Sequence, residues 1–240
     1  MLSSSPANFS LLPLYQPTAN QLRVIVYSHC SGQDVDDVIR RAISLAEQQG
    51  YTLEWKVYGH DTPPDLKDRL LTARFEAEPV EKVMLLRISQ ESLAAFEAPA
   101  YEIRRVHGAD GLDDVAAISS EIGRKNVEDE KERLRIMLRD SPHEMSIYVA
   151  YMDREAVACG RIYFSKGGEF AELAGGRTKT THRNRGLYTA LVAARLQEAF
   201  DRNYRYVCVD ALPTSEPILR KRGFTAITDT QGFVYRPRSL

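Results

Sequence analysis

The second half of the chain concentrates basic side chains directly before a long apolar run. Five of the nine residues from 177 to 185 are basic, in a chain with 32 basic and 33 acidic residues overall. They are Arg177, Lys179, His182, Arg183 and Arg185. The run "LYTALVAARLQEAFDR" that follows Gly186 predicts a helix. Because first-turn amides lack intrahelical partners and lie at the positive end of the helix dipole, this pattern predicts an anion site suited to polyphosphate.

Two common polyphosphate motifs do not fit this loop. A Walker A loop needs Gly-x-x-x-x-Gly-Lys-Ser/Thr, and a dinucleotide-binding turn needs Gly-x-Gly-x-x-Gly after a strand. The sequence "GGRTKTTHRNRG" has neither spacing. Instead, Arg183 and Gly186 form an Arg-x-x-Gly arrangement that leads directly into the helix. A glycine at this point gives the backbone conformational freedom and lets a ligand approach the main chain closely.

The flanking sequence predicts the elements that position this loop. "EFAELAGGRT" before it and "RYVCVDAL" after the helix indicate strands, and "SEPILRKRG" indicates a short helix with Ser215 as N-cap. Read in order, the second part of the chain is β-α-α-β-β-β-α-β-α-β, and the first part is β-α-β-α-β. We therefore predict an irregular lead-in (1–20), an N-terminal part (21–88), a linker (89–100) and a main domain (101–240).

The N-terminal part matches the last five predicted elements of the chain in kind and order. The stretch "LEWKVYGHDTPPDLKDRLLTARF" parallels "YVCVDALPTSEPILRKRGF", with a strand, a proline-containing loop, a short basic helix and a phenylalanine. We interpret the N-terminal part as a half-copy of the C-terminal fold; the alternative is that α/β proteins repeat this alternation by default. Its first helix starts with Asp34, Asp36 and Asp37, which would repel a pyrophosphate.

The basic loop resembles the signature of the GCN5-related N-acetyltransferases, the GNAT superfamily. That signature is Gln/Arg-x-x-Gly-x-Gly/Ala between a strand and a helix, and Tyr188 replaces its final residue here. "PTSEPILRKRGF" is similar to a second family motif, a short helix that ends in Gly-Phe. The resemblance covers roughly residues 100–240 and implies an α+β fold. In this fold a mixed, mostly antiparallel central sheet is flanked by helices, and the N-terminal part is a degenerate half-domain of similar topology.

The resemblance also implies that acetyl-CoA is the cofactor. The amides of residues 184–189 would hold its pyrophosphate, and the strand ending at residue 178 would pair with its pantetheine arm. Amides of the same strand would stabilise an oxyanion. The cofactor-binding residues expected on this basis are Gly176, Arg177, Thr178, Arg183, Asn184, Arg185, Gly186, Leu187, Tyr188 and Thr189.

Acetyl transfer to an amine needs a base, and Glu172 is the best candidate. It stands eleven residues before Arg183, as the catalytic glutamate does in the histone-acetylating branch of the superfamily. We expect a semi-buried strand position that raises its pKa; the alternative is an ordinary outward-facing glutamate, and Glu169 is a weaker second choice. The tyrosine that serves many relatives as general acid is replaced by Leu219. Ser215 is a weak substitute, and the sequence leaves the positions of Tyr188, Tyr204 and Tyr206 open.

These observations favour an N-acetyltransferase acting on a primary amine of a small molecule or protein, by direct attack in a ternary complex. The alternative is a non-catalytic CoA- or anion-binding sensor with the same fold. A net charge of −1 argues against nucleic-acid binding. Three widely spaced cysteines and an N-terminus without a signal-peptide pattern predict a cytoplasmic protein that contacts no membrane. We expect no metal site, and a monomer or homodimer.

Overall fold

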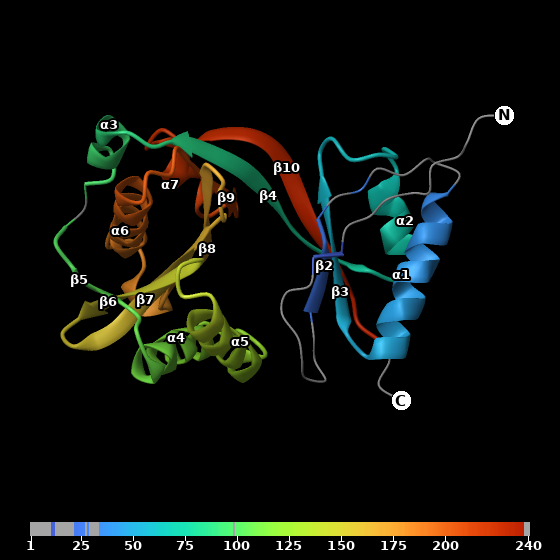
Figure 1. Cartoon of the computed structure of the whole chain (residues 1–240), viewed down its shortest axis with the longest axis horizontal. Coiled ribbons are helices and arrows are strands. Elements are labelled where there is room, and N and C mark those ends of the chain that lie inside the picture. Colours follow the sequence, from blue (N-terminus) through green and yellow to red (C-terminus); the bar gives the residue numbers. More distant parts are fainter. Residues whose placement is uncertain (1–10, 13–21, 27, 29–33, 98, 238–240) are drawn as a thin grey trace. The chain divides into compact units, whose positions relative to one another are not determined.

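The computed structural model describes residues 11–12, 22–26, 28, 34–97 and 99–237 of the 240-residue chain. The chain divides into two compact units (Figure 1). The first unit combines Met1–Lys82 with Thr228–Leu240, and the second unit is Val83–Ile227. Each unit contains both helices and strands, so the mixed α/β class predicted from the sequence is confirmed.

The first unit is a small sheet covered by two helices. Its elements are β1 (Leu11–Leu12), β2 (Leu22–Ile25), α1 (Val35–Gln49), β3 (Thr52–Tyr58), α2 (Leu66–Thr72) and the first residues of β4 (Glu76–Arg87). β2 and β3 are parallel strands joined through α1, whereas β1 pairs antiparallel with β2. Buried side chains of α1, α2 and β3 form one core around Trp55, so both helices pack on the same face of β3 (Figure 1).

The first unit also takes a strand from the C-terminal end of the chain. β10 (Thr225–Tyr235) pairs antiparallel with β3, from Thr230 opposite Tyr58 onwards. Phe233 of β10 is buried in the same core as α1 and α2. The Gln231 side chain donates a hydrogen bond of 2.9 Å to the Glu78 carbonyl of β4. The strand order of this unit is therefore β1-β2-β3-β10-β4.

The second unit is the larger one, and it contains the basic loop. Its further elements are α3 (Gln90–Ala94), β5 (Glu102–Arg105), α4 (Ala109–Glu121), α5 (Val127–Asp140), β6 (Met145–Met152), β7 (Glu155–Phe164), β8 (Phe170–Thr178), the 3₁₀ turn η1 (Thr180–His182), α6 (Leu187–Asp201), β9 (Tyr206–Ala211) and α7 (Glu216–Arg220). The strand order is β4-β9-β8-β7-β6-β5. β5 to β8 pair antiparallel in succession, and β8 and β9 are parallel.

Helices cover both faces of this second sheet. Along β7, Ala158 and Ile162 pack with residues of α6, whereas the intervening Cys159 packs with α4 and α5. Since neighbouring residues of a strand point to opposite faces, α6 lies on one face, and α4 and α5 lie on the other (Figure 1). The basic loop is therefore anchored between a central strand, β8, and a helix that is buried against the sheet.

The structure differs from the sequence-based prediction at three places. The run "EKVMLLRI" predicts a strand over residues 81–88, whereas β4 in the structure begins at Glu76. The predicted linker at residues 89–100 contains the helix α3, which Ser89 and Ser92 close with a reciprocal capping box. The last strand, expected to complete the main domain, pairs within the first unit. The compact units thus cut the chain at other points than the predicted boundaries.

The last strand of the chain pairs within the first unit because the two halves of the chain exchange their last strands. From Val83 onwards β4 belongs to the second unit, where the Ile88 amide donates to the Arg205 carbonyl at 2.9 Å. Each half of the chain therefore gives its final strand to the other half's unit. In the described part of the chain, no helix has the length and apolar character needed to cross a membrane.

Candidate functional site

The loop between β8 and α6 has a backbone that few residues adopt. Asn184 and Gly186 both lie in the left-handed region, with φ of +61° and +89°. Asn and Gly are the residues that tolerate this region best. A Cβ added to Gly186 would meet only Pro99, at an ordinary 3.5 Å. The glycine is therefore required by backbone conformation rather than by lack of space.

The start of α6 leaves its first-turn amides available. Gly186 is the N-cap, no side chain of the described residues caps the helix, and its first turn contains no acid. The first intrahelical bond runs from the Ala190 amide to the Gly186 carbonyl, at 3.0 Å. The side chains of Leu187 and Thr189 are buried, so these two predicted residues offer a ligand their amides alone. Such a helix start attracts anions.

Four of the five residues in the predicted basic cluster form two groups, and the fifth, His182, has its Nδ1 3.0 Å from the Thr181 hydroxyl. Arg183 and Arg185 are exposed at the loop, where they contact only the carbonyls of Thr178 and Thr181, at 3.5 and 3.4 Å. In the described part of the chain, neither guanidinium forms an ion pair.

Arg177 and Lys179, in contrast, are buried. Arg177 pairs with Glu130 of α5 at 2.7 Å, and Lys179 pairs with Glu155 at the same distance. The expectation that all five basic residues surround the turn is therefore wrong for these two side chains.

Arg177 ties β8 to the helices on the far face of the sheet. Its guanidinium donates to both carboxylate oxygens of Glu130 and, at 2.5 Å, to the Ser119 hydroxyl of α4. Arg161 of β7 also donates to Glu130, at 3.0 Å. Burial raises the pKa of the Glu130 carboxyl, but the two guanidinium groups outweigh burial and lower it to about 2. Gly175 makes this possible, because a Cβ there would lie 2.5 Å from Arg161 Nη1.

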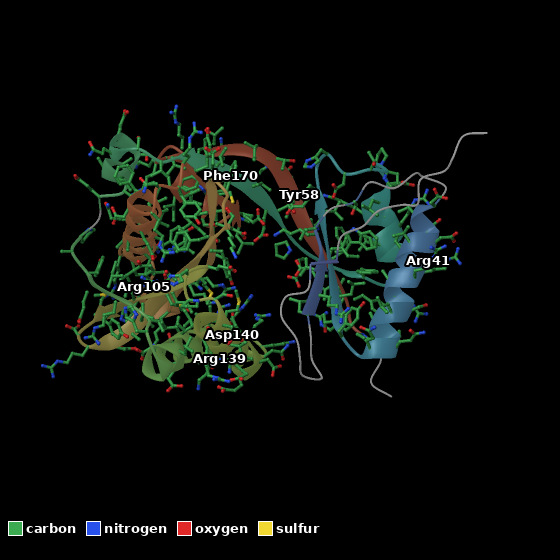
Figure 2. All side chains as sticks on the ribbon, in the orientation of Figure 1. Arg41, Tyr58, Arg105, Arg139, Asp140 and Phe170 are labelled. Atoms are coloured by element: carbon green, nitrogen blue, oxygen red, sulfur yellow. The ribbon has the colours of Figure 1, made fainter. Side chains whose placement is uncertain are left out.

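The strands β8 and β9 separate near the loop. They pair from Phe170 opposite Tyr206 to Leu173 opposite Val209, and both continue beyond. At the closed end, the Phe170 ring stacks on Tyr206 with centroids 5.1 Å apart. Figure 2 labels Phe170. On its other side β8 pairs with β7 through a register shift, a β-bulge, near Gly175. Gly176 and Thr178 therefore lie on the part of β8 that has left β9.

Glu172 lies in the paired part of β8, next to this opening. Its neighbours Ala171 and Leu173 pack in the core with α6, so its own side chain points to the opposite face. Glu172 is exposed, and it sits in register with Cys208 of β9. The expected semi-buried position is therefore wrong, although the side chain does flank the point where the strands separate.

Two further residues approach the opening from the side of α6. The ring of Tyr188 lies against Gly176, since a Cβ on that glycine would be 2.9 Å from Tyr188 Cε2. The phenol interacts with the Ser215 side chain, which follows β9. Ser215 is the N-cap residue of α7, as predicted, but its hydroxyl makes no cap hydrogen bond and donates to the Leu212 carbonyl at 3.2 Å. Leu219, where many relatives have tyrosine, is fully buried.

Sequence reasoning left the position of Tyr188 open. Neither Tyr188 in the first turn of α6 nor Gly176 near the end of β8 indicates the contact by itself. Only the two residues together do so. Large and small residues that face each other across a packed contact compensate in volume. That pairing becomes visible once the strand and the helix are placed.

Comparison with known proteins gives one family match and several similar folds. The acetyltransferase (GNAT) family model matches residues 112–224. No curated protein matches the sequence. Among solved structures, a functionally unknown conserved protein from Staphylococcus epidermidis has a TM-score of 0.67 at 13% identity, covering 90% of this chain and 85% of that one.

Two further structures have GNAT descriptions. A GCN5-related N-acetyltransferase from Kribbella flavida has a TM-score of 0.65 at 16% identity, covering 91% of this chain and 82% of its own. A tandem GNAT protein from the clavulanic acid biosynthesis pathway has a TM-score of 0.62 at 12% identity, covering 90% and 75%. These likenesses extend over nearly the whole chain, so the N-terminal half belongs to the shared fold. The tandem protein fits a fold built from two related halves.

Proposed function

Because residues 112–224 match the acetyltransferase (GNAT) family model, we propose that this protein is an N-acetyltransferase. It transfers an acetyl group from acetyl-CoA to a primary amine of a small molecule or a protein, by direct attack in a ternary complex. The observation that carries the proposal is the start of α6 beside two separating strands: Gly186 has a positive φ, no described side chain caps the helix, and two arginines form no ion pair with any described residue. This arrangement suits an elongated ligand that is anionic at one end.

The residues of the loop fit the pyrophosphate of acetyl-CoA. The amides of residues 184–189 lie at the helix start, and Arg183 and Arg185 add positive charge that no carboxylate of the described residues neutralises. The part of β8 from Gly176 to Thr178 has left β9 and offers main-chain groups to the pantetheine arm and to an oxyanion. When bound, acetyl-CoA supplies the activated thioester. Arg177 contributes main-chain groups only, since its guanidinium holds Glu130.

Glu172 is the proposed base, acting directly or through one water. It stands on the face of the sheet opposite α6, at the edge of the strand opening. An amine that enters from this face meets the carboxylate before it meets the thioester. Glu169 is less suitable, because its carboxylate forms an ion pair of 2.5 Å with Arg205.

Two measurements on the full chain test this function. Calorimetry with CoA and acetyl-CoA measures binding, and thiol release from acetyl-CoA with a panel of primary amines measures turnover. We expect saturable binding of both ligands and thiol release with at least one small amine or lysine-containing peptide. Binding without thiol release from any amine would support the non-catalytic sensor instead. If neither CoA nor acetyl-CoA binds, both the N-acetyltransferase and the non-catalytic CoA sensor are excluded.

The remaining expectations about partners are part of the same proposal. The acceptor is a small-molecule or protein amine, and the protein binds neither nucleic acid nor membranes as part of its function. Duplex DNA in the calorimeter at low salt is the control, because phosphate contacts made by a basic loop weaken steeply with salt. Light scattering after size exclusion distinguishes a monomer from a homodimer.

A further inference from the structure

A buried cation beneath α6 has no anionic partner among the described residues. Arg195 is 1% exposed. Its Nε donates to the Leu191 carbonyl at 2.9 Å and its Nη1 to the Arg161 carbonyl at 3.0 Å. Its Nη2 is buried without a hydrogen-bond partner. Burial lowers the pKa of Arg195 to about 10, so the group remains charged at neutral pH.

The fold accommodates the buried guanidinium of Arg195 at a cost in stability. A Cβ on Gly160 of β7 would lie 2.8 Å from the Arg195 Cζ, so only glycine permits the guanidinium to reach the sheet. Burying an unpaired charge and an unsatisfied N–H is destabilising. Because its burial lowers the stability of the fold, Arg195 needs a role other than stabilisation. The nearest polar groups indicate that role.

Tyr188 interacts electrostatically with this cation. The two residues are seven positions apart on α6, which places them on the same side of the helix. Burial raises the pKa of the Tyr188 phenol, and the charge of Arg195 and the interaction with Ser215 oppose that rise. The half-buried phenol thus lies where the charge of Arg195 can stabilise its anion.

The same phenol lies at the strand opening. Its ring contacts Gly176 on the part of β8 beyond the last pair with β9, and its hydroxyl interacts with Ser215, which follows β9 in the chain. Tyr188 therefore approaches the opening from the face of α6, whereas Glu172 stands on the opposite face. A base on one face and a phenol on the other suit a reaction in which the amine arrives and the thiol departs on different sides.

We propose, as an extension of the proposed function, that Tyr188 is the general acid of acetyl transfer and that Arg195 stabilises its phenolate. The amine nitrogen forms the new C–N bond as the C–S bond of the thioester breaks. The sulfur takes the phenolic proton with the electron pair of the broken bond, and CoA leaves as the thiol. The proton lost by the amine passes to Glu172 or water, and solvent then restores the phenol. Nothing is oxidised or reduced.

Tyr188→Phe is the central test, because it removes the hydroxyl and keeps the ring that packs on Gly176. With an amine that turns over, we expect kcat to fall about 10- to 100-fold, the lower end of general-acid effects, while KM for acetyl-CoA stays within two-fold. Tyr204→Phe is the matched control: its ring packs on the same core, but its hydroxyl donates to the Ser165 carbonyl at 3.0 Å. An unchanged kcat in Tyr188→Phe, or an equal loss in Tyr204→Phe, would overturn the proposal.

Arg195 is tested as a positioning residue through Tyr188. Arg195→Lys keeps the charge but not the planar fork, and we expect it to lower kcat several-fold in the wild-type background. In the Tyr188→Phe background the same change should have no further effect, because the phenolate it stabilises is gone. Equal losses in both backgrounds would show that Arg195 serves structure alone and would overturn its proposed role.

A binding experiment separates this proposal from the proposed function. Calorimetry compares CoA with desulfo-CoA, which lacks only the sulfur. We expect the wild-type protein to prefer CoA by about five-fold, the worth of one hydrogen bond, and Tyr188→Phe to lose the preference. Equal binding of both ligands by the wild-type protein would overturn the contact between Tyr188 and the sulfur. The proposed function would survive that result, and it fails only if neither ligand binds.

Discussion

Two parts of the molecule share one plan and differ in charge. In each unit a 15-residue helix joins two parallel strands: α1 links β2 to β3, and α6 links β8 to β9. α6 starts at Gly186 with φ of +89° and has no acid in its first turn. α1 starts at Asp34 with φ of −98°, and Asp36 and Asp37 occupy its first turn. The comparison teaches that the two helix starts of this fold differ both in N-cap backbone conformation and in first-turn charge, and that an anion site requires the two together.

The acids of α1 serve structure instead. Asp36 accepts a hydrogen bond of 2.7 Å from Arg69 of α2, and Arg69 also pairs with Asp65. Asp37 pairs with Arg40 one turn further along α1. The negative charge at this helix start therefore helps to attach α2 and compensates the helix dipole. The first turn of α6, in contrast, contains no acid.

The largest effect on CoA affinity is expected at Gly186, the N-cap residue at which α6 differs most from α1. Proline fixes φ near −65°, so Gly186→Pro cannot keep the loop conformation at +89°. We expect at least about a 1,000-fold loss of CoA affinity, roughly 4 kcal/mol, while most of the fold stays intact. Calorimetry measures affinity and circular dichroism checks the fold. Asp34→Gly in α1 is the control and should leave CoA binding unchanged; an affinity that survives Gly186→Pro would contradict the site.

The strand exchange predicts an effect at a distance along the sequence. Phe233 is 1% exposed and packs with α1 and α2, although it belongs to the C-terminal strand. Phe233→Ala should destabilise the first unit by about 3–4 kcal/mol. Hydrogen exchange should rise in α1 and α2. Phe224→Ala, nine residues earlier, removes a ring from the core of the second unit and should instead loosen α6. Faster hydrogen exchange in α6 after Phe233→Ala, together with faster hydrogen exchange in α1 and α2 after Phe224→Ala, would disprove the exchange of last strands.

The buried basic residues of the second unit predict an acid-sensitive stability. The folded-state pKa of Glu130, about 2, lies below its ordinary value of 4.5. Its contribution is therefore complete above pH 4.5 and is lost as the pH falls towards 2. Glu130→Gln should lower the unfolding free energy at pH 7 by about 2–3 kcal/mol and flatten its decline below pH 4.5. Urea titrations measure this, and Glu128→Gln, exposed on the same helix, should change neither quantity.

The smallest effects should come from exposed charges at the two helix starts. Arg183→Ala and Arg185→Ala should each weaken CoA binding by about 5- to 10-fold, since each removes one solvent-exposed contact with phosphate. Asp36→Asn with Asp37→Asn in α1 should leave CoA affinity unchanged and create no second site. Calorimetric stoichiometry checks this: a second equivalent of bound CoA would show that charge alone separates the two helix starts.

Local sequence signals predicted the elements and the loop but not the fate of each side chain. Gly186, the strand before it and the helix after it are encoded in neighbouring residues, so periodicity and turn chemistry suffice. Arg177 and Lys179 left the predicted cluster because they extend to partners on α5 and β7. Those partners are remote in sequence, and the bulge near Gly175 changes which face of β8 each residue uses.

The catalytic side was predicted less completely for the same reason. Glu172 was placed on β8 correctly, but its exposure depends on which face the neighbouring helices cover. Tyr188 acquires its environment from Gly176, Arg195 and Ser215, and only Arg195 shares its helix. The exchange of last strands was missed because the pairing of β10 with β3 joins residues that lie far apart along the chain. Such pairings leave no local trace in the sequence.

The exchanged strand β10 also constrains how the protein is made. Domains usually fold in order as the chain leaves the ribosome. Here β3, translated early, has no partner on one edge until β10 emerges after the entire second unit. Until then the apolar residues that Phe233 later covers, Trp55 and Phe75 among them, lack part of their cover. The N-terminal unit is thus the last to be completed, and a nascent chain stalled before residue 228 is a natural substrate for chaperones.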